Sequence, residues 1–524
     1  MKKKNPILSV GKTLLVAITC FLSFSCSDFF DPAQDLVQER DEHYDTVEKV
    51  RRATIGAYGQ LQGLVESLVI MGDLRAELLT TTRNYDAFLE EIAEHNISPD
   101  NPYANPRPFY EVILNCNDVL SKMAKAEADP HMTEDLMFAY EAEIRTLRAW
   151  VYLQLIQTYK AVPVVKEAVD GNFPDYEPRE YGEADMLNFL LAEMRWVIEQ
   201  PLLDWRVFNE KNEEVSLPWR YTRINRKALL GELYLLTGNY QSASDILRDC
   251  IINAGEGKDD RYLKCSSLSG SISWGNNWET VTVNANHVSS LEHLTTIPFS
   301  KSNHQTNELL SIFSPLLTNK YLLKPTKVAV NNWKRQNNGN GDSFRGLGSS
   351  YFIYSGERAD TVVNKYLRSK QGYLDDAVYT IYRAADLHLM YAEALNRTGR
   401  TDEALDVLNE NLPGSPHTEG IRGRVSLEPV DLLDVADRNP EIGTQVELFE
   451  IALLEERALE LAYEGKRWNS LMRFANRANR PEWLAKTVAL KYREINPAKA
   501  DELEAKLSDP SNWKLEMPRL KSSK

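Results

Sequence analysis

The sequence has 524 residues and a formal net charge of −15 at pH 7. This acidic balance argues against nucleic acid as a partner and against electrostatic docking on anionic lipid, since both need a basic surface. Hydrophobic residues make up 43% and charged residues 26%, which is typical of a soluble globular protein. The length allows two to four domains or one large helical array.

The N-terminus has the pattern of an export signal. Lysines at positions 2, 3, 4 and 12 give a basic start, and an apolar run over 14–22 follows. This run is too short to span a bilayer. Ser25 is the small residue that cleavage needs, and the thiol of Cys26 is then free to carry a diacylglycerol and further acyl chains. We predict a signal peptide over 1–25 and a lipidated tether over 26–43, with cleavage at another site as the alternative.

The cysteines beyond Cys26 have no spacing typical of a metal site or a disulfide framework. Cys116 and Cys250 lie in helical patterns, where a thiol usually behaves as a small buried hydrophobe. Cys265 lies in an irregular stretch. We expect no disulfide among these three cysteines, and we expect no metal and no cofactor.

Helical periodicity begins after the tether. Apolar residues recur at alternating threes and fours from Val47 to Leu64, which predicts one face of a helix. Further helical patterns cover 109–126, 133–159 and 183–199. Residues 85–108 interrupt them with a proline-rich segment and are predicted to be irregular.

Two later segments show the spacing of tetratricopeptide helix pairs, in which small residues stand where helices touch and glycine stands at the turn. The first lies within 224–253 and the second within 387–411. The matching positions of the first are Gly231, Tyr234, Gly238, Tyr240, Ala243 and Leu247, and those of the second are Ala392, Leu395, Gly399, Ala404 and Leu408. The predicted fold is therefore mainly α, although the two pairs are not in tandem.

The segment between these pairs has a different character. Residues 255–375 are rich in Gly, Ser, Asn and Thr and contain short β-like runs at 280–283 and 294–299. Loops of this length in a compact protein are usually functional. We predict a single domain over 44–524, with a helical scaffold over 44–254 and 376–475 and a loop-rich, ligand-binding insertion over 255–375. The last predicted helix covers 445–474.

Most enzyme signatures are missing from the sequence. It contains no GxxxxGK[ST], GxGxxG, HExxH or GxSxG motif. Glycosidases leave no such local signature, because their two carboxylates are paired in space. They therefore stay open as an alternative.

Charged residues form two constellations. Glu456, Glu460 and Glu464 fall on one stripe of a helix, with Arg457 and Arg467 within reach, and we interpret them as a structural ion network. Asp73 and Arg75 follow the first helix. We interpret this pair as fixing a loop, with ligand binding as the alternative.

Aromatic residues in irregular segments are the main ligand-binding candidates. In Trp274-Gly-Asn-Asn-Trp278 two indoles flank a polar turn that contains Asn277. Sugar rings present C–H faces that stack on aromatic rings, while their hydroxyls hydrogen-bond to amides and charged groups. The other aromatic candidates are Tyr85, Tyr103, Trp333 and Tyr351. The alternative for each of them is a place in the core.

Several stretches of the sequence carry a family resemblance when they are taken together. They are Ser25-Cys-Ser-Asp-Phe-Phe-Asp31, Phe109-Tyr-Glu-Val-Ile-Leu-Asn-Cys-Asn117, Glu143-Ile-Arg-Thr-Leu-Arg-Ala-Trp150, Val162-Pro-Val164, Asn364-Lys-Tyr-Leu367, Asp386 to Asn396, Glu456-Arg457 and Glu464-Gly-Lys-Arg-Trp468. In this order they resemble the SusD/RagB family of outer-membrane nutrient-binding lipoproteins of Bacteroidota. One departure is that Arg422-Gly-Arg424 is displaced by an insertion. The resemblance carries over no ligand residue, because the binding loops of the family do not align by motif.

The resemblance implies an α-helical scaffold of tetratricopeptide-like pairs on the outside of the cell, lipidated at Cys26. It implies a binding protein rather than an enzyme, acting as a lid over a TonB-dependent transporter of the SusC type. Members mostly bind oligosaccharides, and some bind peptides. Our first hypothesis is therefore a surface glycan-binding lipoprotein, with peptide binding as a variant. The alternatives are a surface glycoside hydrolase and a scaffold that binds only protein, which predicts buried indoles at Trp274 and Trp278.

Overall fold

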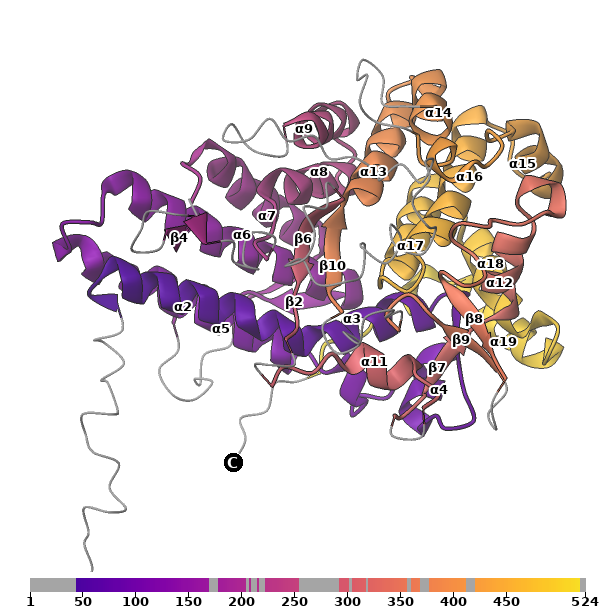
Figure 1. The fold of residues 1–524 in the computed structure, drawn as a ribbon, viewed down its shortest axis with the longest axis horizontal. Helices are drawn as coiled ribbons and strands as arrows, with labels where there is room; N and C mark the ends of the chain where they lie inside the picture. The colour runs from indigo at the N-terminus through magenta and orange to yellow at the C-terminus, as the bar shows by residue number, and fades with distance from the viewer. Residues whose placement is uncertain are drawn as a thin grey trace, which may run out of the picture.

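The computed structural model describes residues 44–168, 178–203, 207–208, 214–215, 222–253, 292–300, 304–316, 319–355, 360–367, 377–410 and 420–518. Helices dominate this part of the chain and pack side by side with only short strands between them, which confirms the mainly α fold (Figure 1). Cys26, Cys265, Trp274, Asn277 and Trp278 lie outside the described residues. Among the described helices, none combines the length and the apolar character that crossing a bilayer requires.

The N-terminal helices follow the predicted periodicity closely. They are α2 (Val47–Gly59), α5 (Arg107–Lys122), α6 (Glu134–Thr158) and α7 (Glu183–Glu199). Thr46 and Thr133 cap α2 and α6, because each side chain accepts a hydrogen bond from a backbone N–H of the first turn. α5 packs between α2 and α6, and α7 packs on α6. Cys116 is a buried thiol of this layer.

Both predicted tetratricopeptide-like pairs are present. The first is α8 (Arg226–Leu236) with α9 (Tyr240–Ile252), and the second is α13 (Ala384–Arg397) with α14 (Thr401–Asn409). Gly238 and Gly399 occupy the turns with φ of 76° and 80°, a conformation that favours glycine. A Cβ on Gly231 would come within 2.6 Å of the Leu247 side chain, so glycine permits the close approach of α8 and α9.

The two pairs are adjacent in space although they are far apart in sequence. α13 packs on α9 and on α8, so the second pair continues the stack that the first begins (Figure 1). The intervening chain therefore leaves the helical stack and returns to it. The short sheet of β6 (His293–Ile297) and β10 (Tyr379–Arg383) lies at the return, directly before α13.

The strands of the described residues pair only in antiparallel two-stranded sheets. Besides β6 with β10, these sheets pair β1 (Leu79–Thr81) with β7 (Leu323–Pro325), β2 (Ala161–Pro163) with β3 (Glu180–Gly182), β4 (Val207–Phe208) with β5 (Glu214–Val215), and β8 (Tyr351–Tyr354) with β9 (Asp360–Val363). β6 confirms the β-like run at 294–299, whereas the run at 280–283 lies outside the described residues.

Two segments that were predicted to be irregular contain helices. The described part of 255–375 includes α11 (Glu308–Phe313) and α12 (Lys327–Lys334), and α4 (Ala87–Ala93) lies within 85–108. Asn307, Thr326 and Asp86 cap these three helices with their side chains. These short helices carry too few turns to show a clear hydrophobic period in the sequence.

The C-terminal region differs from the prediction in two ways. The helix expected over 445–474 is divided into α16 (Gln445–Glu460) and α17 (Arg467–Ala478), and Tyr463 and Gly465 have positive φ in the turn between them. The chain also remains helical beyond 475, in α18 (Pro481–Arg493) and α19 (Pro497–Leu507). Together with α15 (Leu432–Arg438), these helices form a separate hydrophobic cluster.

Candidate functional site

The carboxylates of α16 belong to a buried ion network, as predicted. Glu460 accepts hydrogen bonds from Arg345 and from Arg383, at 2.8 Å in each case. Arg383 and Lys365 also pair with Glu464, and Arg345 and Arg422 pair with Glu456. Paired charges are the form in which a protein interior tolerates ions.

The partners of these carboxylates differ from those predicted. Arg457 pairs with Asp386 at 2.9 Å, and Arg467 pairs with Glu77 at 2.5 Å. Glu456 and Glu460 lie on α16 and face Arg345, Arg383 and Arg422 from other segments. The prediction of one helical stripe is wrong for Glu464, because α16 ends at Glu460 and Glu464 lies in the turn before α17.

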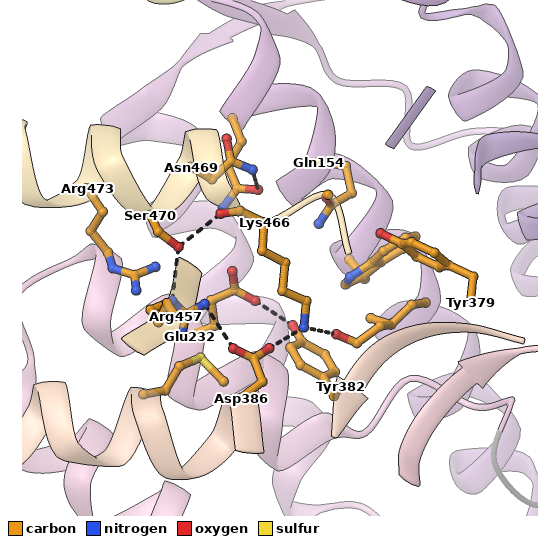
Figure 2. A pocket seen from close by; sticks show the side chains of 15 residues that line it. Gln154, Glu232, Tyr379, Tyr382, Asp386, Arg457, Lys466, Asn469, Ser470 and Arg473 are labelled. Carbon is orange, nitrogen blue, oxygen red and sulfur yellow. Dashed lines mark hydrogen bonds and ion pairs between the residues drawn. The ribbon is translucent and has the colours of Figure 1, made fainter. Parts of the chain in front are cut away.

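The Arg457–Asp386 pair lies in the wall of a first cavity. Lys466 reaches across this cavity to Asp386 and donates a second hydrogen bond to the backbone oxygen of Ile381 at 2.7 Å (Figure 2). Burial alone would raise the pKa of Asp386, but the Lys466 and Arg457 cations outweigh it and lower the pKa to about 2. Asp386 is therefore a fixed anion at neutral pH.

We name this cavity the Lys466 pocket. It has a volume of about 50 Å³, and its walls include Trp150, Gln154, Gln157, Glu232, Tyr379, Ile381, Tyr382, Asp386, Met390, Arg457, Gly465, Lys466, Asn469, Ser470 and Arg473. Tyr382 donates to Glu232 at 2.5 Å, and Asn469 donates to Gln157 at 2.9 Å. The charged groups of the pocket also have partners, since Asp386 pairs with Arg457 and Lys466, and Arg473 pairs with Glu393 outside the lining.

A second cavity, the Tyr103 pocket, adjoins the first. It has a volume of about 30 Å³ and is lined by Ser67, Leu68, Met71, Gly72, Arg75, Tyr103, Ala104, Asn105, Phe109, Gln154, Leu155, Thr158, Tyr159, Gly465, Trp468 and Asn469. Gln154, Gly465 and Asn469 line both cavities, so the two cavities share part of a wall. Asn105 is exposed and Tyr103 is half-buried, which places both at the rim of the pocket.

Asp73 and Arg75 have different roles in the structure. Asp73 accepts hydrogen bonds from the backbone N–H groups of Gly465, at 2.8 Å, and of Arg467, at 3.2 Å, so it fixes the turn between α16 and α17. This contact supports the loop-fixing interpretation. Arg75 instead lines the Tyr103 pocket, with its guanidinium 4.4 Å from the centre of the Trp468 ring.

The predicted aromatic candidates divide into surface and core residues. Tyr85 is 41% exposed beside α4, and the Tyr103 hydroxyl donates to Asp86 at 3.0 Å. The assignment of Trp333 and Tyr351 to irregular segments is wrong. Trp333 belongs to α12 and Tyr351 to β8, and they are only 1% and 3% exposed. Their rings lie 5.7 Å apart in the core and have no free face on which a sugar could stack.

Of the polar residues that line the Tyr103 pocket, Arg75 was a candidate from the sequence, whereas the amides of the two cavities and Lys466 were not. Gln154 and Gln157 are amides within a largely apolar stretch of α6, and this interruption is the local signal that points to them. Asn105 stands in the proline-rich segment that was noted only as a loop. Lys466 stands at the N-cap of α17 and Asn469 lies in its first turn, directly after the turn that was predicted to be helical.

Comparisons with known proteins agree with this architecture. The model of the SusD family matches residues 254–517. A SusD-like protein P38 of Formosa agariphila is 21% identical over 499 residues, which cover 89% of this chain and 91% of the relative.

Two solved structures have the same fold. A SusD superfamily protein from Bacteroides thetaiotaomicron aligns with a TM-score of 0.65 and 20% identity, covering 87% of this chain and 94% of that one. Surface glycan-binding protein A from Bacteroides uniformis aligns with a TM-score of 0.62 and 18% identity, covering 84% and 91%. The family model matches half of the chain, and the chain therefore belongs to the SusD family.

Proposed function

We propose that this protein is a lipid-anchored, cell-surface glycan-binding protein that passes oligosaccharides to a TonB-dependent transporter of the SusC type. The observation that carries the proposal is the Tyr103 pocket, a surface cavity with an aromatic ring and polar side chains at its rim. Relatives described as surface glycan-binding proteins share the fold and add support.

The Tyr103 pocket has the chemistry that sugar recognition needs. Tyr103 offers a ring on which a sugar face can stack, and Asn105, Gln154 and Asn469 offer amides that both donate and accept hydrogen bonds to hydroxyls. A cavity of about 30 Å³ is smaller than a sugar ring and holds two or three waters. The ligand would therefore lie across the mouth and insert only a substituent.

The Lys466 pocket favours binding over catalysis. It contains two carboxylates, Glu232 and Asp386, as a glycosidase site would. A general acid needs a pKa near the working pH, whereas the pKa of Asp386 is lowered to about 2 by Lys466 and Arg457 despite its burial. An ionised Asp386 could still act as a nucleophile, but Arg457 and Lys466 already pair with its carboxylate and a cavity of about 50 Å³ is too small for a sugar ring. This enclosure supports a protein that captures a glycan unchanged.

Substitution of Tyr103 tests the proposed site. We expect Tyr103→Ala to weaken binding of the best ligand in a panel of α-glucan, β-glucan, xylan and mannan oligosaccharides by about tenfold or more, because a central aromatic contact is lost. Tyr103→Phe keeps the ring and removes only the hydroxyl that donates to Asp86, so binding should persist. Isothermal titration calorimetry measures both variants.

An aromatic residue outside the pocket provides the control. Phe138 is 36% exposed near the start of α6, about 24 Å along the helix from Gln154, and Phe138→Ala should bind like the wild type. Equal binding by Tyr103→Ala and wild type would refute the site. Binding only of peptides would refute the glycan assignment, and release of shorter products from a bound glycan would refute a purely binding role.

The anchor is tested at Cys26. We propose lipidation there because Cys26 follows the apolar run and a small residue. The wild-type chain should take up a fatty-acid label and fractionate with the outer membrane, and cross-linking in cells should recover a TonB-dependent barrel. Cys26→Ala should lose the label and the membrane association. A labelled, membrane-bound Cys26→Ala protein, or wild type without a barrel partner, would contradict the proposed placement.

A further inference from the structure

Arg75 is an unusual buried arginine. It is only 1% exposed, and no carboxylate pairs with it among the residues that the structure describes. Its contacts are a 2.5 Å hydrogen bond from Nη2 to the backbone oxygen of Trp513 and the Trp468 ring. Arg345 and Arg383, which are equally buried, each pair with several carboxylates. Burying a charge without a counter-ion costs free energy, so a binding role would explain why an arginine stands at position 75.

A second buried cationic group, Lys491, lies close to Arg75, but it is only partly protonated at neutral pH and the Glu77 and Glu94 carboxylates also act on it. The Lys491 Nζ donates to the backbone oxygens of Leu74 and Ala76, at 3.0 and 3.1 Å. Burial lowers the pKa of Arg75 to about 9 and that of Lys491 to about 7. An anion that reached this site would therefore stabilise the charged form of Arg75.

Two residues that line the Tyr103 pocket each have a buried donor without a hydrogen-bond partner among the described residues. The donors are Nε of Arg75 and Nε1 of Trp468. Each group can only donate, so a matching ligand must present acceptor oxygens. The fork of a guanidinium fits the two oxygens of a carboxylate, and a cavity of about 30 Å³ has the size of that group rather than of a whole sugar.

We infer that the Tyr103 pocket selects acidic sugars, with the carboxylate of a uronic acid inserted toward Arg75 and Trp468 and the sugar ring held at the rim by Tyr103. This inference rests on the proposed glycan-binding function and narrows it to a substrate class. Arg75 becomes a specificity-determining residue, because only a ligand with an acidic substituent provides its missing counter-ion.

The distribution of charge sets a limit on the ligand. The chain has a formal net charge of −15, which repels polyanions at long range. Asp86 also lies at the hydroxyl end of the Tyr103 ring, 3.0 Å from its oxygen. A glycan with isolated uronic acids among neutral sugars fits this arrangement better than a continuous polyanion.

Paired ligands test the inference in the wild-type protein. Oligosaccharides that contain glucuronic or galacturonic acid are titrated beside their carboxyl-reduced forms, which keep every ring and lose only the charge. We expect reduction to weaken binding at least about tenfold, as for the loss of a charge-assisted hydrogen bond. Neutral and sulfated oligosaccharides complete the panel.

Variants then assign the preference to Arg75. In Arg75→Gln the affinities for the acidic oligosaccharide and for its carboxyl-reduced form should become nearly equal. Arg75→Lys should keep part of the preference for the acidic form, because it keeps the charge and loses the paired N–H donors of the guanidinium. Arg52→Gln makes the same chemical change on the exposed face of α2, where the Arg52 side chain is 75% exposed, and should leave the ratio unchanged.

The outcomes separate this inference from the proposed function. Equal binding of acidic and reduced forms by the wild type overturns the inference, and so does tightest binding of a sulfated sugar. If the wild type binds both forms equally and Tyr103→Ala binds neither, the proposed glycan-binding function is still supported. Failure to bind any oligosaccharide in the panel contradicts both. An acid preference that survives in a folded Arg75→Gln protein overturns the assignment to Arg75.

Discussion

Replacing Gly72 by alanine is expected to prevent stable folding. A Cβ at this position would lie 1.9 Å from the backbone oxygen of Gly465 and 2.3 Å from its carbonyl carbon. Gly465 has little freedom to retreat, since its φ is 73° and its own Cβ position lies 2.6 Å from the backbone oxygen of Leu68. Overpacking of flexible side chains costs about 1–3 kcal/mol, and a clash between two backbones exceeds that range.

A glycine in open space provides the control for Gly72→Ala. Gly56 lies within α2 and has no atom within 4 Å of its Cβ position. Gly56→Ala should stabilise the protein by about 0.5–1 kcal/mol, because alanine favours a helix. Soluble yield and urea unfolding measure both variants. A Gly72→Ala protein that unfolds at the wild-type urea concentration would show that the two segments separate without cost.

The contact between Gly72 and Gly465 matters for the site as well as for stability. Gly72 belongs to the π-helix Ile70–Leu74 and lines the Tyr103 pocket, while Gly465 lines both pockets. π-helical turns are rare and frequently mark functional sites. The Asp73 carboxylate also accepts a hydrogen bond from the Gly465 N–H, so both the close approach of Gly72 and this bond fix the Gly465 backbone in the wall that the two cavities share.

The helices were predictable because their signal is local. The alternation of threes and fours from Val47 to Leu64 reflects one buried face, and the spacing of Gly231 and Leu247 reflects one helix pair. The same periodicity placed Glu456 and Glu460 on one face of α16, which is why their role in a structural network could be inferred from the sequence, whereas the end of the helix before Glu464 could not.

The rest of the site depends on contacts across long stretches of sequence. Arg345 lies 111 residues before its partner Glu456, and Gly72 lies almost 400 residues before Gly465, so no local pattern connects them. Composition was also a poor guide to exposure. Trp333 stands in a segment rich in Gly, Ser, Asn and Thr, which predicted an irregular structure, yet α12 places it in the core. Tyr103 came from the same reasoning and lies at a cavity rim.

Removal of the Arg383 guanidinium should cause the second large effect. The side chain is fully buried and pairs with Glu292 at 2.9 Å, with Glu460 at 2.8 Å and with Glu464 at 2.8 Å. Burial alone would lower the pKa of Arg383, but these carboxylates raise it well above the ordinary value, so the guanidinium is always charged. Arg383→Met keeps much of the volume and removes the positive charge from three buried acids at once.

We expect Arg383→Met to lower the free energy of unfolding by about 3–5 kcal/mol, the usual cost of breaking a buried ion pair from one side. Arg52→Met makes the same change in an exposed pair with Glu48, in which the side chains are 75% and 56% exposed, and should cost less than about 1 kcal/mol. Urea unfolding at neutral pH compares the two variants. Similar small losses in both would mean that the network of α16 contributes little to stability. A large loss of unfolding free energy only in Arg383→Met would show that the network holds strand β10 against α16. Asp386 follows β10 and Lys466 follows α16, so the same network would set the positions of both residues in the Lys466 pocket.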